Sequence, residues 1–326
     1  MIDRKWIMVE PTMTQGIGCN PPNPKVLWTP NTFINGSKLL QAKRYHILSP
    51  DLLNDKADAY YLISCIDHHL DLEIEFVKRV RKEGSKVVLA ISQDSRFQTG
   101  HGLLQHDTNT VYTDLCKEVD CIWGGVPPDL HIYGSNQNKV IDAGDFIERS
   151  NRSTKPYNER TIDLLGTGGV GEVNISFYIV LFSMIKEKYP DKRVVYAFRN
   201  LPDYTPVCIK MQNKFSNIEF IQYNFPDLLN DSKAYINLEL RPRGGRAVLE
   251  AWYHRVPSIS FDQTYFSKLF PEFSFDMISF DKIFRLYEKM MNSDYNKLIK
   301  KSEKIMEYDY FEKVYDRIIN KLDEVK

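Results

Sequence analysis

The sequence lacks the features that would assign it at once to a simple class. Its 43 basic and 43 acidic residues cancel, so bulk charge does not favour nucleic acid as a partner. Its five cysteines include no Cys-x-x-Cys pair, which argues against a disulfide framework. The most apolar stretch, residues 175–185, is too short to span a bilayer, and the charged N-terminus is followed by no apolar run of signal-peptide length. We therefore expect a cytoplasmic protein with reduced thiols.

Internal repeats, low-complexity tracts and Asp-x-Asp motifs are also absent. Because no ligand set with metal-site spacing is evident either, the sequence predicts neither a metal nor a cofactor. At 326 residues the chain is long enough for two domains of ordinary size, each with its own core. Short apolar runs that fit buried strands alternate with stretches of helical spacing, which is typical of α/β proteins with parallel sheets.

The most informative stretch covers residues 234–262. An apolar run at 234–240 fits a buried parallel strand. The Arg-Pro-Arg-Gly-Gly sequence at 241–245 ends it, because proline lacks an amide and glycine allows positive φ. Helical spacing of apolar residues follows over 246–254, and Val-Pro then stops the helix before a strand at 258–261. The stretch therefore predicts a βαβ unit with a basic, glycine-containing turn.

The start of this helix is a candidate anion site. Its free amides and partial positive charge lie beside Arg241, Arg243 and Arg246, a combination that suits a phosphate or pyrophosphate. Glu250 lies about one turn inside the helix, where its carboxylate can accept hydrogen bonds from a ribose or sugar diol. The alternative is that Glu250 is a solvated helix residue and the arginines form an ordinary charged loop.

The sequence LEAWYHRVPSISFD at 249–262 resembles the C-terminal signature of retaining GT-B glycosyltransferases of the family-four type. The resemblance implies two Rossmann-like parallel-sheet domains that face each other across a cleft. It also implies sugar transfer from a nucleotide sugar, UDP- or GDP-linked, to an acceptor that the sequence does not identify as glycan, lipid or protein. Two glutamates eight positions apart frame the donor in that family. The second corresponds to Glu250, whereas Pro242 occupies the position of the first.

The resemblance also implies how the chain is divided. Residues 1–150 are expected to form an acceptor-side domain, and residues 161–326 a nucleotide-sugar-binding domain with C-terminal helices. The polar, irregular stretch 146–160 is expected to be the linker between them. Proteins of this type often return their last helix to the first domain, and the amphipathic stretch 311–322 is a candidate for that. A basic amphipathic helix face is also a weak candidate for peripheral membrane contact, since acidic residues are interleaved.

A second glycine turn follows the strand expected at 161–165. Its Gly166-x-Gly168-x-x-Gly171 spacing literally matches a dinucleotide fingerprint, so a Rossmann oxidoreductase is an alternative. The GT-B assignment is preferred because that fold uses both glycine turns around one donor. The family's arginine and lysine at this turn are missing, with Thr167 and Glu172 nearby instead. The resulting donor-binding candidates are Gly168, Gly169, Arg199, Arg241, Gly244, Gly245 and Arg246.

Candidates for the acceptor side follow expected strands of the first domain. They are Gly16 and Gly18 after a strand at 6–9, Asp67 and His68 after a strand at 58–64, and His101 in a later polar loop. Gln93-Asp94, after a strand at 86–92, stands where the family has His-Asp, so the resemblance gives Asp94 a hydrogen-bonding role toward the acceptor hydroxyl. Surface loops and capping of a helix by Asp67 are the structural alternatives.

The resemblance thus implies catalytic roles for Asp94, Arg243 and Glu250 in a metal-independent, retaining glycosyltransferase. The missing first glutamate and the missing cation pair leave other functions open. A GT-B epimerase or phosphorylase, or an inactive sugar- or nucleotide-binding module, would share the same fold.

Overall fold

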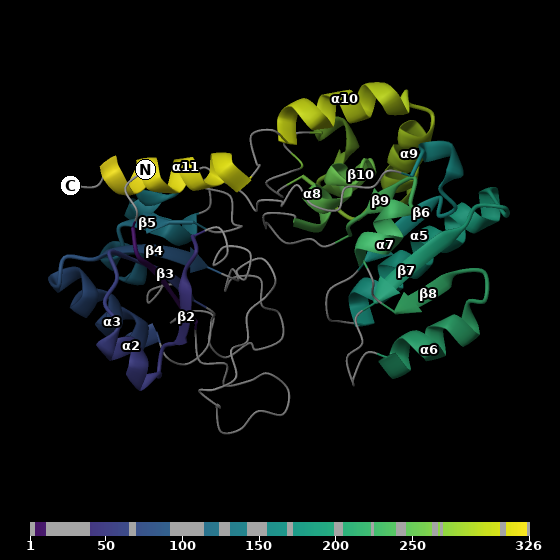
Figure 1. Ribbon diagram of the computed structural model, residues 1–326. Coiled ribbons are helices and arrows are strands. Elements are labelled where there is room, and N and C mark those ends of the chain that lie inside the picture. The colour runs from purple at the N-terminus through teal and green to yellow at the C-terminus, as the bar shows by residue number, and fades with distance from the viewer. Residues whose placement is uncertain are drawn as a thin grey trace. The chain divides into compact units, whose positions relative to one another are not determined.

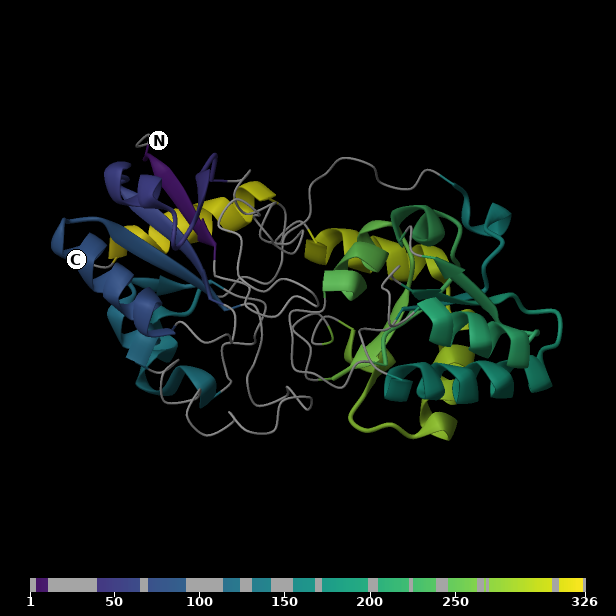
Figure 2. The same ribbon diagram turned by 90° about the horizontal axis from the view of Figure 1, so that it is seen from below.

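The computed structural model describes residues 4–10, 40–64, 70–91, 114–123, 131–141, 155–167, 172–198, 205–222, 225–238, 246–262, 267, 270–306 and 311–324. The chain divides into two compact units, one of Met1–Phe146 with Phe311–Lys326 and one of Ile147–Tyr310. Each unit contains a parallel sheet with helices packed against it (Figure 1, Figure 2). The predicted α/β class with two parallel sheets is therefore confirmed.

The sheet of the first unit has the strand order β2-β1-β3-β4-β5, and all neighbouring strands are parallel. Its strands are β1 Trp6–Glu10, β2 Lys43–His46, β3 Ala59–Ser64, β4 Lys86–Ile91 and β5 Cys121–Ile122. The apolar runs that predict β1, β3 and β4 are buried, as in parallel sheets covered on both faces. The sequence does not predict β2, because this edge strand reads Lys-Arg-Tyr-His and is partly exposed.

Helices cover both faces of this sheet. On one face lie α2 Pro50–Asn54 and α3 Leu70–Lys82, and α11 Phe311–Glu324 lies on the other (Figure 1). Residues 114–118 form a further helical turn. The apolar face of α11, Val314, Ile318 and Leu322, is buried in the core of the first sheet. The stretch 311–322 thus belongs to the first unit, as expected for a last helix that returns to the first domain, so the range 161–326 expected for the second domain is too long at its end.

The sheet of the second unit has the order β11-β10-β9-β6-β7-β8 and is likewise parallel throughout. Its strands are β6 Leu164–Thr167, β7 Val194–Phe198, β8 Glu219–Gln222, β9 Tyr235–Ile236, β10 Ser258–Phe261 and β11 Ser274–Phe275. Its helices are α5 Glu172–Lys188, α6 Thr205–Lys214, α7 Phe225–Asn230, α8 Arg246–Tyr253, α9 Phe280–Met291 and α10 Tyr295–Met306. Short 3-10 helices are η2 His131–Lys139 in the first unit, and η3 Tyr157–Glu159 and η5 Pro271–Phe273 in the second.

One expected strand is shorter in the structure. The apolar run 234–240 is described as far as Leu238, and within that part its ladder pairs are at Tyr235 and Ile236 alone. By contrast, the strand expected at 258–261 matches β10 residue for residue.

The sequence predicts a linker over 146–160, but the described end of this stretch, residues 155–160, is packed into the second unit. Tyr157 stacks on Tyr295 of α10, with ring centroids 4.0 Å apart. Arg160 is 2% exposed, and its guanidinium donates to the backbone oxygens of Ser232, His254 and Arg255 at 2.9–3.1 Å. The expectation is wrong for this segment, because the arginine at its end bonds the carbonyls that follow α8 and one in the loop before β9.

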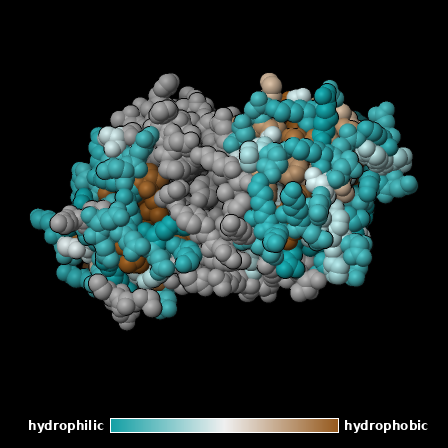
Figure 3. Space-filling view, turned by 90° about the horizontal axis from the view of Figure 1, so that it is seen from above, coloured by the Kyte–Doolittle hydropathy of each residue, from teal (hydrophilic) through white to brown (hydrophobic). Residues whose placement is uncertain are grey.

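No helix within the described ranges has the length and apolar character needed to cross a membrane. On the face shown in Figure 3, hydrophilic residues cover most of the described surface, and apolar residues appear as separate islands.

Candidate functional site

The strand order of the second sheet places a topological switch point between β6 and β9. The chain enters the sheet at β6, adds β7 and β8 on one side, and returns to add β9, β10 and β11 on the other. In open parallel sheets, ligands bind outside the carboxyl ends of the strands where the order reverses in this way. The carboxyl ends of β6 and β9 therefore define the candidate site.

Both glycine turns singled out from the sequence follow these two strands. Gly168 and Gly169 come directly after β6, and the basic turn 241–245 lies between β9 and α8. Arg199 directly follows β7, the other neighbour of β6. The predicted residues Gly168, Gly169, Arg199, Arg241, Arg243, Gly244 and Gly245 themselves lie outside the described residues. The strands that precede them are neighbours in the sheet, so their carboxyl ends lie side by side at the same edge.

Helix α8 begins at Arg246 and ends at Tyr253, as the helical spacing predicts. Its apolar face is buried, and Trp252 stacks on Phe270 with ring centroids 3.8 Å apart. Glu250 is half-buried, one turn after the start of the helix. Of the predicted donor-side residues, the structure thus places Arg246 and Glu250 four positions apart on one helix that follows the switch-point strand β9.

Tyrosine hydroxyls hold the carboxyl ends of β6 and β9. The hydroxyl of Tyr178, on α5, donates to Thr167 O at 2.6 Å and accepts from Leu238 N at 2.9 Å. Beside it, the hydroxyls of Thr167 and Tyr235 are 2.7 Å apart. The sequence alone does not distinguish these tyrosines, because a tyrosine in an apolar run predicts only a core residue.

Gly166 has a packing role. A Cβ at this position would lie 2.5 Å from Cε1 of Tyr178 and 2.9 Å from Cζ of Phe182. The absent side chain therefore lets α5 approach β6 closely. The first glycine of the apparent dinucleotide fingerprint is thus explained by helix–strand packing, whatever ligand the turn holds.

The first sheet also reverses its order, with β2 on one side of β1 and β3 on the other. Glu10 ends β1, is completely buried, and accepts hydrogen bonds from the guanidinium of Arg44 on β2 at 2.6 Å. This pair is not among the predicted site residues, although a lone carboxylate at the end of an apolar run is a usable signal in the sequence. The acceptor-side candidates Gly16, Gly18, Asp67, His68, Asp94 and His101 lie outside the described residues, after β1, β3 and β4.

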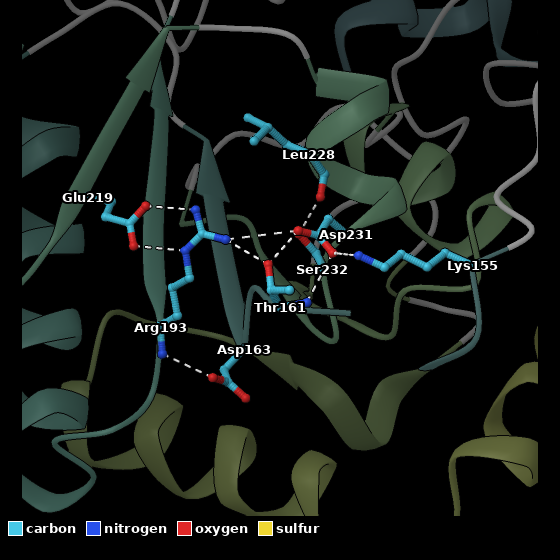
Figure 4. A network of polar contacts seen from close by, with 8 residues as sticks. All are labelled: Lys155, Thr161, Asp163, Arg193, Glu219, Leu228, Asp231 and Ser232. Carbon is cyan, nitrogen blue, oxygen red and sulfur yellow. Dashed lines mark hydrogen bonds and ion pairs between the residues drawn. The ribbon is translucent and has the colours of Figure 1, made fainter. Parts of the chain in front are cut away.

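The opposite, amino edge of the second sheet carries a network of charged residues (Figure 4). Arg193, before β7, donates to both carboxylate oxygens of Glu219 at 2.8 Å and to the Thr161 hydroxyl at 2.6 Å. Asp231, before β9, accepts from Lys155 and from Thr161 N. These contacts join the start of the unit to three of its strands.

Asp163 is the most buried carboxylate of this network. Burial works to raise its pKa, but hydrogen bonds from Arg193 N, Lys192 and Lys233 at 2.9–3.1 Å outweigh burial, so the pKa lies below its usual value. The network therefore favours the ionised carboxylate and uses it to bind neighbouring segments of the protein.

The described part of the chain offers neither a metal-binding cluster nor a reactive thiol. It contains no cluster of three or more histidine, cysteine, aspartate or glutamate residues that could hold a metal. Cys116, Cys121 and Cys208 are free and buried, and burial raises their pKa values to about 12, 12 and 11. These thiols are therefore neutral core residues rather than nucleophiles.

No protein-family model matches the sequence, and neither does any curated protein. The structure is similar to several solved structures. Staphylococcus aureus TarM in complex with UDP has a TM-score of 0.58 and 14% identity over 81% of this chain and 55% of TarM. The pneumococcal O-GlcNAc transferase GtfA, in complex with UDP and GlcNAc, has a TM-score of 0.59 and 12% identity over 84% of this chain and 58% of GtfA.

A third similar structure is the UDP-forming α,α-trehalose-phosphate synthase of Burkholderia xenovorans. Its TM-score is 0.60, with 11% identity over 84% of this chain and 75% of the synthase. This chain spans somewhat over half the length of TarM and GtfA. Similarity at this level of identity shows the fold, and the chain has the GT-B glycosyltransferase fold.

Proposed function

We propose that this protein is a glycosyltransferase that moves a sugar from a nucleoside diphosphate sugar, UDP-linked in the first instance, to a hydroxyl of a glycan, lipid or protein. The observation that carries the proposal is the switch point between β6 and β9. One glycine turn directly follows β6, and the second turn and the Glu250 helix come between β9 and β10. The UDP in the similar structures of TarM and GtfA supports the choice of nucleotide. Three buried free thiols support a reducing compartment such as the cytoplasm.

In this proposal the turn after β6 and the turn before α8 hold the diphosphate through backbone amides. Arg199, Arg241, Arg243 and Arg246 supply the positive charge that the missing family cations would give. Glu250 accepts hydrogen bonds from the ribose hydroxyls, and Asp94 from the acceptor hydroxyl. Positioning of the acceptor and stabilisation of the departing diphosphate then carry the reaction, with retention of configuration at the sugar.

A thermal-shift panel of nucleoside diphosphates and their sugars tests the proposal, because a ligand that binds the folded state raises the midpoint of unfolding. We expect UDP and a UDP-sugar to raise it, and adenosine dinucleotides to have no effect. A shift with NAD alone would support the oxidoreductase alternative. Binding of UDP-sugar without transfer or hydrolysis would identify a binding module.

The arginines provide a matched test of the diphosphate site. Changing Arg243 or Arg246 to alanine should weaken UDP binding by about 1.5–3 kcal/mol, the range for hydrogen bonds to charged groups. Arg285, exposed on α9, is the control and should leave UDP affinity unchanged when replaced by alanine. Equal affinity in all three variants would return the two arginines to the solvated-loop interpretation.

Metal removal gives an independent prediction. The sequence has no Asp-x-Asp motif, and the described residues include no group of three or more side chains that could bind a metal. EDTA should therefore leave UDP binding and turnover unchanged. UDP titrations with and without EDTA measure this. Binding that is lost in EDTA and restored by Mn²⁺ would contradict the metal-independent mechanism.

A further inference from the structure

The hydroxyl of Tyr178 lies where the pairing of β6 with β9 stops. The two strands are in parallel register up to Gly166 and Ile236. Hydrogen bonds in a parallel ladder repeat at even spacing, so one further step would join Leu238 N directly to Thr167 O. That direct bond is replaced by a bridge through the hydroxyl, which accepts from Leu238 N at 2.9 Å and donates to Thr167 O at 2.6 Å.

One oxygen atom between two backbones holds them further apart than a direct N–H···O bond would. The strands therefore separate at this point instead of pairing for another step. A second contact of the hydroxyl, 3.3 Å from Ile236 O, keeps it close to the last paired residue of β9. The bridge thus opens the sheet between the two strands that flank the switch point.

The position of this hydroxyl is fixed by packing. Tyr178 is 1% exposed, and its ring lies over Gly166, where a Cβ would not fit. The rings of Phe182 and Tyr196 pack against it, with centroids 5.7 and 5.0 Å away. A side chain that changes rotamer freely could not hold two strands apart, but the Tyr178 ring is confined by its packing and can do so.

We infer that Tyr178 is a positioning residue of the donor site: its hydroxyl keeps the crevice between the carboxyl ends of β6 and β9 open to a nucleoside diphosphate. The inference rests on the proposed function. Without the hydroxyl, Leu238 N and Thr167 O can bond directly, so the crevice closes by one ladder step while the backbone groups stay paired. Loss of the hydroxyl therefore impairs ligand binding more than folding.

The test is UDP titration of Tyr178→Phe, which removes one oxygen and keeps the ring. We expect the dissociation constant for UDP to rise about tenfold, which corresponds to the free energy of one hydrogen bond. The thermal midpoint of unfolding should stay close to that of the wild type. The matched control is Tyr295→Phe. In the wild type the Tyr295 hydroxyl donates to Arg255 O at 2.8 Å, in the loop between α8 and the amino end of β10. This control should bind UDP like the wild type.

The outcomes separate the inference from the function on which it rests. A wild type that binds no nucleoside diphosphate overturns both. A wild type that binds UDP, with unchanged affinity in Tyr178→Phe, overturns the inference and leaves the proposed function standing. The inference is also overturned if Tyr178→Phe fails to fold, or if both tyrosine variants lose affinity equally, because the hydroxyl is then a structural group.

Discussion

At the amino edge of the second sheet, charged side chains pair with one another and with backbone groups, whereas at the carboxyl edge the described contacts are made by hydroxyl groups, backbone atoms and a glycine. Arg160, Asp163 and Arg193 belong to the first set, and Gly166 and Tyr178 to the second. Charges at the amino edge bind segments of the protein to each other. The glycine turns follow strands at the carboxyl edge, so under the proposed function the amino edge serves stability and the carboxyl edge serves ligand binding.

The largest effect that would sharpen this comparison is expected at Arg160. Replacing it with methionine keeps much of the volume but removes the buried donor to Ser232 O and His254 O, while Arg255 O keeps the Tyr295 hydroxyl. We expect a loss of about 3–5 kcal/mol in the free energy of unfolding, measured in urea, as for other broken buried charge contacts. Arg285→Met on the exposed surface of α9 should change it by less than about 0.5 kcal/mol. Similar losses in the two variants would show that Arg160 is no anchor.

A smaller effect is expected at Gly166, which lies at the carboxyl edge but serves packing. Gly166→Ala places a methyl group 2.5 Å from the ring of Tyr178, and the resulting overpacking should cost about 1–3 kcal/mol in urea unfolding. Gly84→Ala is the contrasting control, because φ at Gly84 is +92° and no atom lies within 4 Å of an added Cβ. Replacing Tyr178 with leucine should reduce the Gly166→Ala penalty but not the Gly84→Ala penalty. A penalty at Gly166 that does not depend on residue 178 would contradict the packing explanation.

The smallest effect concerns the pH dependence of stability at Asp163. Its folded pKa is lowered, so its contribution is present above the unfolded pKa of about 4 and is lost as the pH falls toward the folded value. Asp163→Asn should therefore cost about 1 kcal/mol at pH 7 and less at pH 3, which urea unfolding across this range measures. Asp281→Asn, at an exposed position on α9, should cost little at either pH. A constant penalty at Asp163 from pH 7 to pH 3 would contradict this assignment.

The strands that the sequence predicts best are those buried on both faces. β10 matches its expected range because a continuous apolar run flanked by polar residues has few alternatives in an α/β protein. β2 and the two-residue β11 are not predicted, since an edge strand needs no continuous apolar run and a short strand has no period to detect. The place of α11 in the first unit follows from the family resemblance, because local spacing alone shows an apolar face but not which core that face completes.

For the candidate site, too, local sequence patterns do not show which segments become neighbours. The sequence predicts that glycine turns follow two strands, but only the strand order shows that β6 and β9 are neighbours at a switch point. It assigns Arg160 to a linker because polar residues there give no sign of burial, although three carbonyls from distant segments meet the guanidinium. The sequence pattern assigns Gly166 to a ligand-binding fingerprint, whereas the structure shows that glycine is needed there because the ring of Tyr178 leaves no room for a Cβ.

The central claim, that the carboxyl edge of the second sheet binds a nucleoside diphosphate, is tested most directly at Glu250. UDP and 2′-deoxy-UDP are titrated into the wild type and into Glu250→Gln, which keeps the volume and nearly the helix propensity of the half-buried glutamate. The account predicts that Glu250→Gln weakens UDP binding by about 1–3 kcal/mol and 2′-deoxy-UDP binding much less, with thermal stability unchanged. Equal wild-type affinity for the two nucleotides, or unfolding of Glu250→Gln, would contradict it.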